Sequence, residues 1–130
     1  MNDSNINIPK GPRADQLSSL TKLVLRTPDS CFDNLPLWNY EPQYFMSRLY
    51  GLDVRMAYYD LGDKRSEETI LLTHGMSAWS YLNRRMIPPL LDAGYRVILF
   101  DQVGCGRSDK PVREEDIPMR DILVGILICL

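Results

Sequence analysis

The sequence predicts an α/β fold, a mostly parallel sheet with flanking helices, from two apolar runs and the helical stretch between them. Residues 69–73 and 95–100 contain short, continuous apolar runs, which are typical of strands covered on both faces. Residues 80–91 are helical in content. A strand, a helix and a strand with short connections form a βαβ unit, so we expect parallel strands and a right-handed crossover. The length of 130 residues favours one domain.

The first 24 residues are predicted to form a disordered or short helical extension. Residues 1–16 are rich in asparagine, proline, glycine and aspartate, a composition typical of disorder. Four apolar residues then recur at the spacing of an amphipathic helix: Leu17, Leu20, Leu23 and Val24.

The residues that precede the first parallel strand predict three further features. Prolines and asparagines within 27–42 indicate an irregular segment. Partial alternation over residues 52–60 predicts a half-buried antiparallel strand. The charged residues 62–68 predict a turn. The aromatic residues expected to hold the irregular segment are Phe32, Trp38 and Tyr40.

The helical stretch of residues 80–91 is predicted to have one apolar side. Pro88 and Pro89 must break or restart this helix, because proline lacks the backbone donor and its ring clashes with the preceding turn. Gly94 is expected to end it in the left-handed conformation. The apolar side consists of Leu82, Met86, Ile87, Leu90 and Leu91.

Composition excludes several classes of function. The 15 basic and 17 acidic residues give a net charge of −2, which provides no electrostatic reason to expect nucleic acid or an anionic membrane as a partner. Three separate cysteines and one histidine form neither a metal-ligand pattern nor a disulfide framework, which favours a reducing, cytoplasmic location. Residues 1–10 do not resemble a secretory signal, and the apolar run at 122–130 is shorter than the ~20 residues that span a bilayer.

His74 and Gly75 follow the first parallel strand, at the edge where open α/β sheets bind ligands. Glycine permits a sharp turn, after which the backbone N–H of Met76 can point at a developing negative charge. The His74 side chain is expected to bond backbone groups, because a ring buried against the turn cannot also reach a nucleophile on another strand. Trp79 is equally compatible with lining a pocket and with packing, whereas packing is favoured for Tyr81 and Met86.

The loop at residues 101–111 contains no catalytic motif. The third glycine of a dinucleotide-binding fingerprint is missing, as are the glycines that a nucleophile elbow requires around its serine or cysteine. We expect Ser108 and Asp109 to bond local amides, and Asp101 to organise the loop rather than act as an acid or base. The glycines that permit the tight turn are Gly104 and Gly106.

Two stretches carry a family resemblance. Residues 73–88, Thr-His-Gly-Met-Ser-Ala-Trp-Ser-Tyr-Leu-Asn-Arg-Arg-Met-Ile-Pro, are similar to H-G-x-P-T-W-S-Y-L-x-R-x-M-I-P. Residues 100–111, followed by three acidic residues, are similar to D-x-x-G-x-G-x-S-D-K-P. These patterns resemble the α/β-hydrolase superfamily and, within it, the haloalkane dehalogenases. The resemblance implies the N-terminal part of an α/β-hydrolase core at residues 25–116, an incomplete fold, followed by a divergent tail at residues 117–130.

This resemblance implies hydrolysis of a carbon–halogen bond by covalent catalysis. An aspartate displaces halide from a halogenated alkane or related small molecule, and a histidine held by an acid then activates the water that cleaves the alkyl ester. The backbone N–H of Met76 would form half of the oxyanion hole, and neither cofactor nor metal is needed. The nucleophile, catalytic histidine and acid do not match any residue here, so we expect the chain to be a truncated fragment that is inactive alone.

Departures from the family pattern leave other functions open. Met76 replaces the family's Glu or Asn, and Ser77 replaces its proline. One alternative is therefore an epoxide hydrolase or esterase of the same superfamily. Another is a non-catalytic short product that pairs an open strand edge with a partner.

Overall fold

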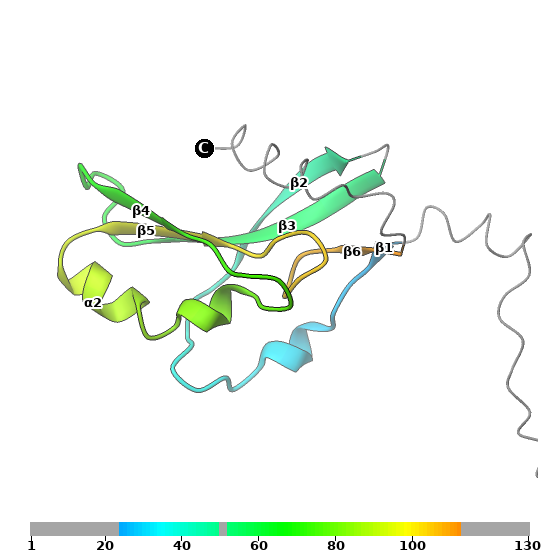
Figure 1. Ribbon diagram of the computed structural model, residues 1–130, viewed down its shortest axis with the longest axis horizontal. Helices are drawn as coiled ribbons and strands as arrows, with labels where there is room; N and C mark the ends of the chain where they lie inside the picture. Colours follow the sequence, from blue (N-terminus) through cyan, green and yellow to red (C-terminus); the bar gives the residue numbers. More distant parts are fainter. Residues whose placement is uncertain (1–23, 50–51, 113–130) are drawn as a thin grey trace, which may run out of the picture.

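The computed structural model describes residues 24–49 and 52–112, whose elements are shown in Figure 1. A four-stranded sheet has the order β2-β3-β5-β4, and a two-stranded sheet pairs β1 with β6. The strands are β1 (Val24–Leu25), β2 (Gln43–Leu49), β3 (Leu52–Leu61), β4 (Thr69–Leu72), β5 (Arg96–Phe100) and β6 (Lys110–Pro111). The helical elements are the 3₁₀ helices η1 (Asp29–Phe32) and η2 (Ser80–Asn83) and the α-helix α2 (Ile87–Asp92).

The parallel pair predicted from the sequence is confirmed. β4 pairs in parallel with β5, with Thr69 opposite Arg96 and Leu72 opposite Leu99. β3 is the antiparallel strand expected at residues 52–60, and it pairs with both β2 and β5. Among the described strands the main sheet is therefore mixed rather than mostly parallel. The antiparallel hairpin partner β2 was not predicted, because its sequence shows no clear alternation of apolar and polar residues.

The helices cover one face of the four-stranded sheet, the face on which η1, η2 and α2 all lie in Figure 1. Val97 and Leu99 of β5 point to this face and are fully buried together with Ile87 of α2. On the other face, Leu71 of β4 is 40% exposed. The prediction that the strand at 69–73 is covered on both faces is wrong for the described residues, because β4 lies at the sheet edge and helices cover only one side.

β3 is buried on both faces in its middle, which differs from the half-buried strand predicted. Val54 and Met56 lie on one face, in the cluster that includes Val103 from the loop after β5. Ala57 and Tyr59 point to the opposite face and are also fully buried. The alternation was therefore assigned correctly, but packing partners from distant segments cover both sides of this strand.

The break or restart that Pro88 and Pro89 predicted within residues 80–91 is confirmed, because this stretch forms two short elements. η2 ends at Asn83 and α2 begins at Ile87, so Pro88 and Pro89 occupy the first turn of a new helix, where proline is tolerated. Because the chain changes direction between the elements, the predicted single apolar side does not form: Leu82 is 58% exposed and Met86 is 51% exposed. Gly94 follows α2 with φ +88°, as expected for the left-handed end of a helix.

The irregular segment at residues 27–42 is held by aromatic packing, as predicted. The Trp38 ring lies edge-on to the rings of Tyr40, Tyr59 and Trp79, with centroids 5.0–5.9 Å apart. Phe32 contacts Trp79 in the same manner, at 5.1 Å. This aromatic cluster, Phe32, Trp38, Tyr40, Tyr59, Trp79 and Tyr81, joins the N-terminal segment to β3 and to the turn after β4.

Several expectations fall outside the described residues. These are the disorder at residues 1–16, the helix expected from residue 17 onward and the tail at 117–130; of that helix, only Val24 is described, and it belongs to β1. No helix within residues 24–49 and 52–112 is long and apolar enough to cross a bilayer.

Candidate functional site

The candidate site lies where the loops after β4 and β5 meet. Because these two strands are parallel and adjacent, their carboxyl ends place residues 73–79 beside residues 101–109. The Gln102 side-chain amide donates a 2.8 Å hydrogen bond to the carbonyl of His74, and thereby joins the two loops. This is the edge of the sheet at which the sequence predicted a site.

Both nitrogens of the His74 ring are engaged with backbone groups, as predicted. Nδ1 lies 2.9 Å from the carbonyl oxygen of Gly75, and Nε2 lies 3.0 Å from the backbone nitrogen of Gln102. Because a carbonyl only accepts and an N–H only donates, Nδ1 carries the proton and Nε2 accepts. The side chain is 5% exposed. His74 is therefore a structural residue and is not free to act as a base.

The turn after His74 leaves the backbone N–H of Met76 unpaired among the described residues. The hydrogen bond that closes this turn runs from the N–H of Ala78 to the carbonyl of Gly75, at 3.3 Å. Met76 as a whole residue is 79% exposed. Ser77 adopts φ +60°, a left-handed conformation that proline cannot adopt. The turn of this chain is therefore incompatible with the proline that stands in the family pattern.

Asp101 organises the loop after β5, as predicted. Its carboxylate is completely buried and accepts hydrogen bonds from the backbone N–H groups of Ser80 and Arg107, both at 2.9 Å. Gly106 passes directly against this carboxylate with φ +45°, and Gly104 has φ +91°. A buried carboxylate whose oxygens each accept a backbone N–H is an anchor for the two loops.

Ser108 and Asp109 bond β3 rather than the local amides that the sequence predicted. The Ser108 hydroxyl accepts from the N–H of Ala57 at 2.9 Å and donates to the carbonyl of Asp101 at 2.6 Å. The Asp109 carboxylate accepts from the N–H of Arg55 at 2.8 Å. The prediction was wrong because β3 runs beside this loop, and contacts across more than 50 residues cannot be read from local turn chemistry.

Arg26 completes this attachment through a bidentate ion pair. Its Nε and a terminal nitrogen lie 2.7 and 2.9 Å from the two carboxylate oxygens of Asp109. Burial raises the pKa of Asp109, but the hydrogen bonds from Arg26 and Arg55 outweigh this effect, so the pKa lies below its ordinary value of 3.8. The ionised carboxylate is therefore favoured in the folded chain.

Replacing Asp109 with asparagine is expected to lower the free energy of unfolding by about 1.5–3 kcal/mol at pH 7, the typical worth of hydrogen bonds to a charged group. Because the folded-state pKa is lowered, this stabilisation is present above the unfolded-state pKa and is lost as the pH falls through the folded-state value. The difference between Asp109→Asn and the parent should therefore shrink on acidification. Urea unfolding at pH 7 and below pH 4 measures it.

Asp63 provides the matched control for this substitution. It also pairs with an arginine, Arg65, but the side chains are 57% and 90% exposed. We expect Asp63→Asn to leave stability nearly unchanged, because exposed ion pairs contribute little. Equal losses for the two variants would contradict a specific role for the Arg26–Asp109 pair.

Trp79 packs within the aromatic cluster. Its ring stacks on Tyr81 at 5.4 Å, and the Tyr81 hydroxyl donates to the carbonyl of Pro36 at 3.0 Å. Packing is therefore confirmed for Tyr81, whereas the side chain of Met86 is largely exposed. The role of Trp79 in a substrate pocket stays a prediction.

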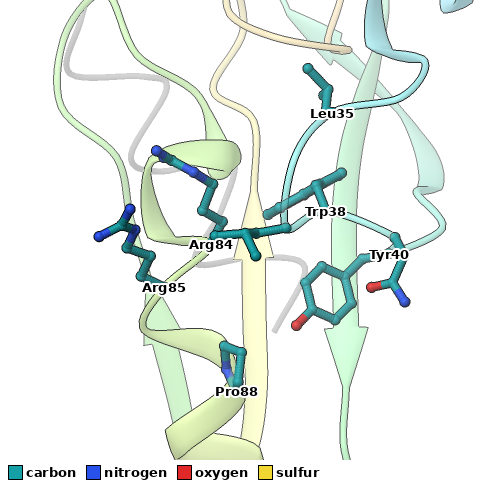
Figure 2. A pocket seen from close by; sticks show the side chains of 8 residues that line it. Leu35, Trp38, Tyr40, Arg84, Arg85 and Pro88 are labelled. Carbon is teal, nitrogen blue, oxygen red and sulfur yellow. The ribbon is translucent and has the colours of Figure 1, made fainter.

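Two cavities lie on either side of the segment at residues 38–40. The larger has a volume of about 680 Å³, and Figure 2 shows Trp38 and Tyr40 facing Arg84, Arg85 and Pro88 across it. The second, of about 460 Å³, lies between η1 and β2 and includes Arg107. Neither cavity is lined by Met76 or Trp79. Both are therefore separate from the His74–Met76 turn.

The described part of the chain shows no metal centre. No three His, Cys, Asp or Glu side chains within residues 24–49 and 52–112 gather in a way that could hold a metal ion. Cys31 is exposed, Cys105 is half-buried, and both are free thiols. Burial raises the pKa of Cys105, which disfavours its reactive thiolate.

Sequence reasoning missed two residues that hold the site together, Gln102 and Arg26. A polar residue directly after a buried strand is a weak signal for Gln102, since its partner lies on another loop. No local signal marks Arg26, which reaches Asp109 across 83 positions in the chain.

Comparisons with known proteins agree on the fold. The sequence model of the family described as alpha/beta hydrolase fold matches residues 68–126. A haloalkane dehalogenase of Psychrobacter cryohalolentis is 48% identical over 94 residues, which cover 72% of this chain and 31% of that protein. The haloalkane dehalogenase of Mycolicibacterium paratuberculosis has the same identity and coverage.

Solved structures give the same result. The tetrameric haloalkane dehalogenase from Paraglaciecola agarilytica NO2 matches with a TM-score of 0.75 and 43% identity, over 82% of this chain and 37% of that one. Epoxide hydrolase A from Mycobacterium thermoresistibile matches with a TM-score of 0.51 and 29% identity, over 68% of this chain and 28% of that one. The chain thus carries part of an α/β-hydrolase fold, resembles haloalkane dehalogenases, and spans about a third of the length of these curated relatives.

Proposed function

We propose that this chain forms part of a haloalkane dehalogenase-like hydrolase, which cleaves a carbon–halogen bond through a covalent alkyl-enzyme ester. The observation that carries the proposal is the turn after β4, where Met76 is an exposed residue whose backbone N–H is unpaired among the described residues. The similarity to haloalkane dehalogenases includes this turn. The proposed substrate is a halogenated alkane or a related small molecule.

In the proposed reaction, Met76 contributes through its backbone. When water attacks the alkyl ester, negative charge develops on the carbonyl oxygen, and a preorganised N–H stabilises that charge. The Met76 side chain is apolar, so it donates no hydrogen bond to a departing halide. His74 keeps the turn in place, and its engaged nitrogens exclude it as the base that activates water.

The described residues do not supply the remaining catalytic groups. The sequence contains one histidine, His74, which is bound to backbone. Of the carboxylates at the site, Asp101 and Asp109 are buried and hold loop and β3 amides. We therefore propose that the nucleophilic aspartate, the catalytic histidine and its acid partner are supplied by further chain. We also propose a cytoplasmic location, because the cysteines are few and separate. The net charge of −2 supports the proposal that neither nucleic acid nor a membrane is a partner.

A chimeric enzyme tests this function. Residues 25–112 replace the matching segment of the Psychrobacter cryohalolentis haloalkane dehalogenase, and halide release from butyl bromide is measured. We expect a folded, active chimera. Met76→Pro, which removes the backbone N–H, should lower kcat by about 10²- to 10³-fold, the usual effect of losing one oxyanion donor.

Met76→Ala is the matched control, because it keeps the N–H and removes only the side chain. It should retain most of the activity of the chimera. A folded chimera that releases no halide, or equal losses for the alanine and proline variants, would contradict the proposal. Circular dichroism of each variant separates a folding defect from a catalytic one.

The alternative is an epoxide hydrolase or an esterase of the same superfamily, and the structural match to epoxide hydrolase A supports the first of these. The described residues do not include the nucleophile, so they do not separate these classes from a dehalogenase. Reading the gene in all three frames beyond the codon for Leu130 distinguishes an esterase from a dehalogenase. An aspartate elbow of the Q-D-W-G-G kind supports the dehalogenase, whereas serine at that position supports an esterase.

A further inference from the structure

We infer that His74 and Gln102 form a positioning pair that sets the direction of the Met76 N–H. The inference rests on the proposed function, in which this N–H is the oxyanion donor. Neither residue touches the reacting atoms. Two of their hydrogen bonds hold the carbonyls of His74 and Gly75, and a third holds the His74 ring, at distances of 2.8–3.0 Å.

His74 holds the peptide group that contains the donor. The carbonyl of Gly75 and the N–H of Met76 belong to the same planar trans peptide, so they point in opposite directions. His74 Nδ1 holds the Gly75 oxygen at 2.9 Å. Because that oxygen is held toward the imidazole, the N–H of Met76 must point away from it, toward the accessible side of the turn.

The two hydrogen bonds of the His74 ring require one protonation state. Nδ1 donates to the Gly75 carbonyl only while it carries the proton, and Nε2 accepts from the Gln102 backbone only while it carries none. The neutral ring protonated at Nδ1 is the one form that makes both bonds. The backbone N–H of Gln102 therefore selects the tautomer that holds the Gly75 peptide.

Gln102 also holds the preceding peptide group, between His74 and Gly75. The side-chain amide of Gln102 donates to the carbonyl of His74 at 2.8 Å, so one residue holds both the ring and the main chain of His74. Otherwise the turn is closed by the 3.3 Å bond from Ala78 to Gly75, and Met76 and Ser77 are exposed. Since packing does not hold these exposed residues, the shorter hydrogen bonds of the pair set the direction of the donor together with this bond from Ala78.

The tautomer can be measured directly in the 130-residue chain, because His74 is its only histidine. Nitrogen-15 NMR is expected to show a protonated Nδ1 and an unprotonated Nε2. Gln102→Glu keeps the shape of the side chain but removes the donor to the His74 carbonyl. We expect this variant to lower the nitrogen-15 order parameters of the Gly75, Met76 and Ser77 amides and to broaden the ring signals.

Gln43→Glu is the matched control, because the same amide-to-carboxylate change occurs on an exposed strand. Gln43 accepts a hydrogen bond from the Tyr58 hydroxyl through its side-chain oxygen, and glutamate retains this acceptor. The control should leave the turn and the ring unchanged. A ring protonated at Nε2, or a Gln102→Glu variant with an unchanged turn, would overturn the inference.

The chimera then connects the pair to catalysis. We expect Gln102→Glu to lower kcat by about 10- to 100-fold with little change in KM, since the donor is misplaced in the transition state rather than in substrate binding. An unchanged kcat in an active chimera would also overturn the inference. An inactive parent chimera combined with the expected NMR result would instead count against the proposed function, while the positioning of the turn would stand.

Discussion

Replacing Asp101 with alanine is expected to lower the free energy of unfolding by about 3–6 kcal/mol, because two backbone donors lose their charged acceptor at about 1.5–3 kcal/mol each. The carboxylate is 0% exposed and accepts from the N–H groups of Ser80 and Arg107. Ser80 is itself buried, so its N–H would have no water to replace the lost partner. Urea unfolding followed by tryptophan fluorescence measures the loss.

Two further variants test whether the loss comes from the two hydrogen bonds of the Asp101 carboxylate. Asp101→Asn should lose about half as much, since the amide keeps one acceptor oxygen and turns a donor toward the other N–H. Asp53→Ala, on an exposed position of β3, should change stability by less than about 0.5 kcal/mol. If Asp101→Ala behaves like Asp53→Ala, the carboxylate does not hold the two loops together.

The parallel strands were predictable because their signals are local. A run of apolar residues that ends in a glycine turn reports a buried parallel strand, and β5 meets that description with Val97 and Leu99 fully buried. β4 has the same pattern and is only half covered. The apolar sequence of β4 predicts burial on both faces. Its actual exposure depends on its position at the edge of the described sheet.

The helical stretch at residues 80–91 shows a second limit. Apolar spacing predicted one apolar side, and the two adjacent prolines predicted a break or a new helix start. The chain turns between η2 and α2, so only the break is confirmed. Leu82 and Met86 are therefore exposed although their spacing matches that of Ile87 and Leu90. Periodicity is informative only while the helix axis continues.

At the candidate site, the residue types were predictable and their partners were not. A glycine turn after β4 and a structural role for His74 follow from residues close together in the sequence. The attachment of Ser108 and Asp109 to β3 spans more than 50 residues, and Arg26 joins from still further away. Such contacts are set by the order of strands in the sheet, which local turn chemistry does not contain.

Gly106 gives the second large effect expected. A Cβ at this position would collide with the carboxylate of Asp101 and would lie 2.8 Å from the Cβ of Trp79, while φ is +45°. We expect Gly106→Ala to lower the free energy of unfolding by about 2–5 kcal/mol, the sum of ~1–2 kcal/mol for a left-handed alanine and ~1–3 kcal/mol for overpacking. Urea unfolding measures this loss.

Gly104→Ala separates the two contributions. Gly104 has φ +91°, but a Cβ there would meet no atom within 4 Å, so only the backbone strain of about 1–2 kcal/mol should appear. A larger loss at Gly106 than at Gly104 would therefore measure the collision with Asp101 and Trp79. Equal losses would mean that the loop after β5 can move away from the turn after β4. In that case Asp101 could not hold the two loops in one arrangement.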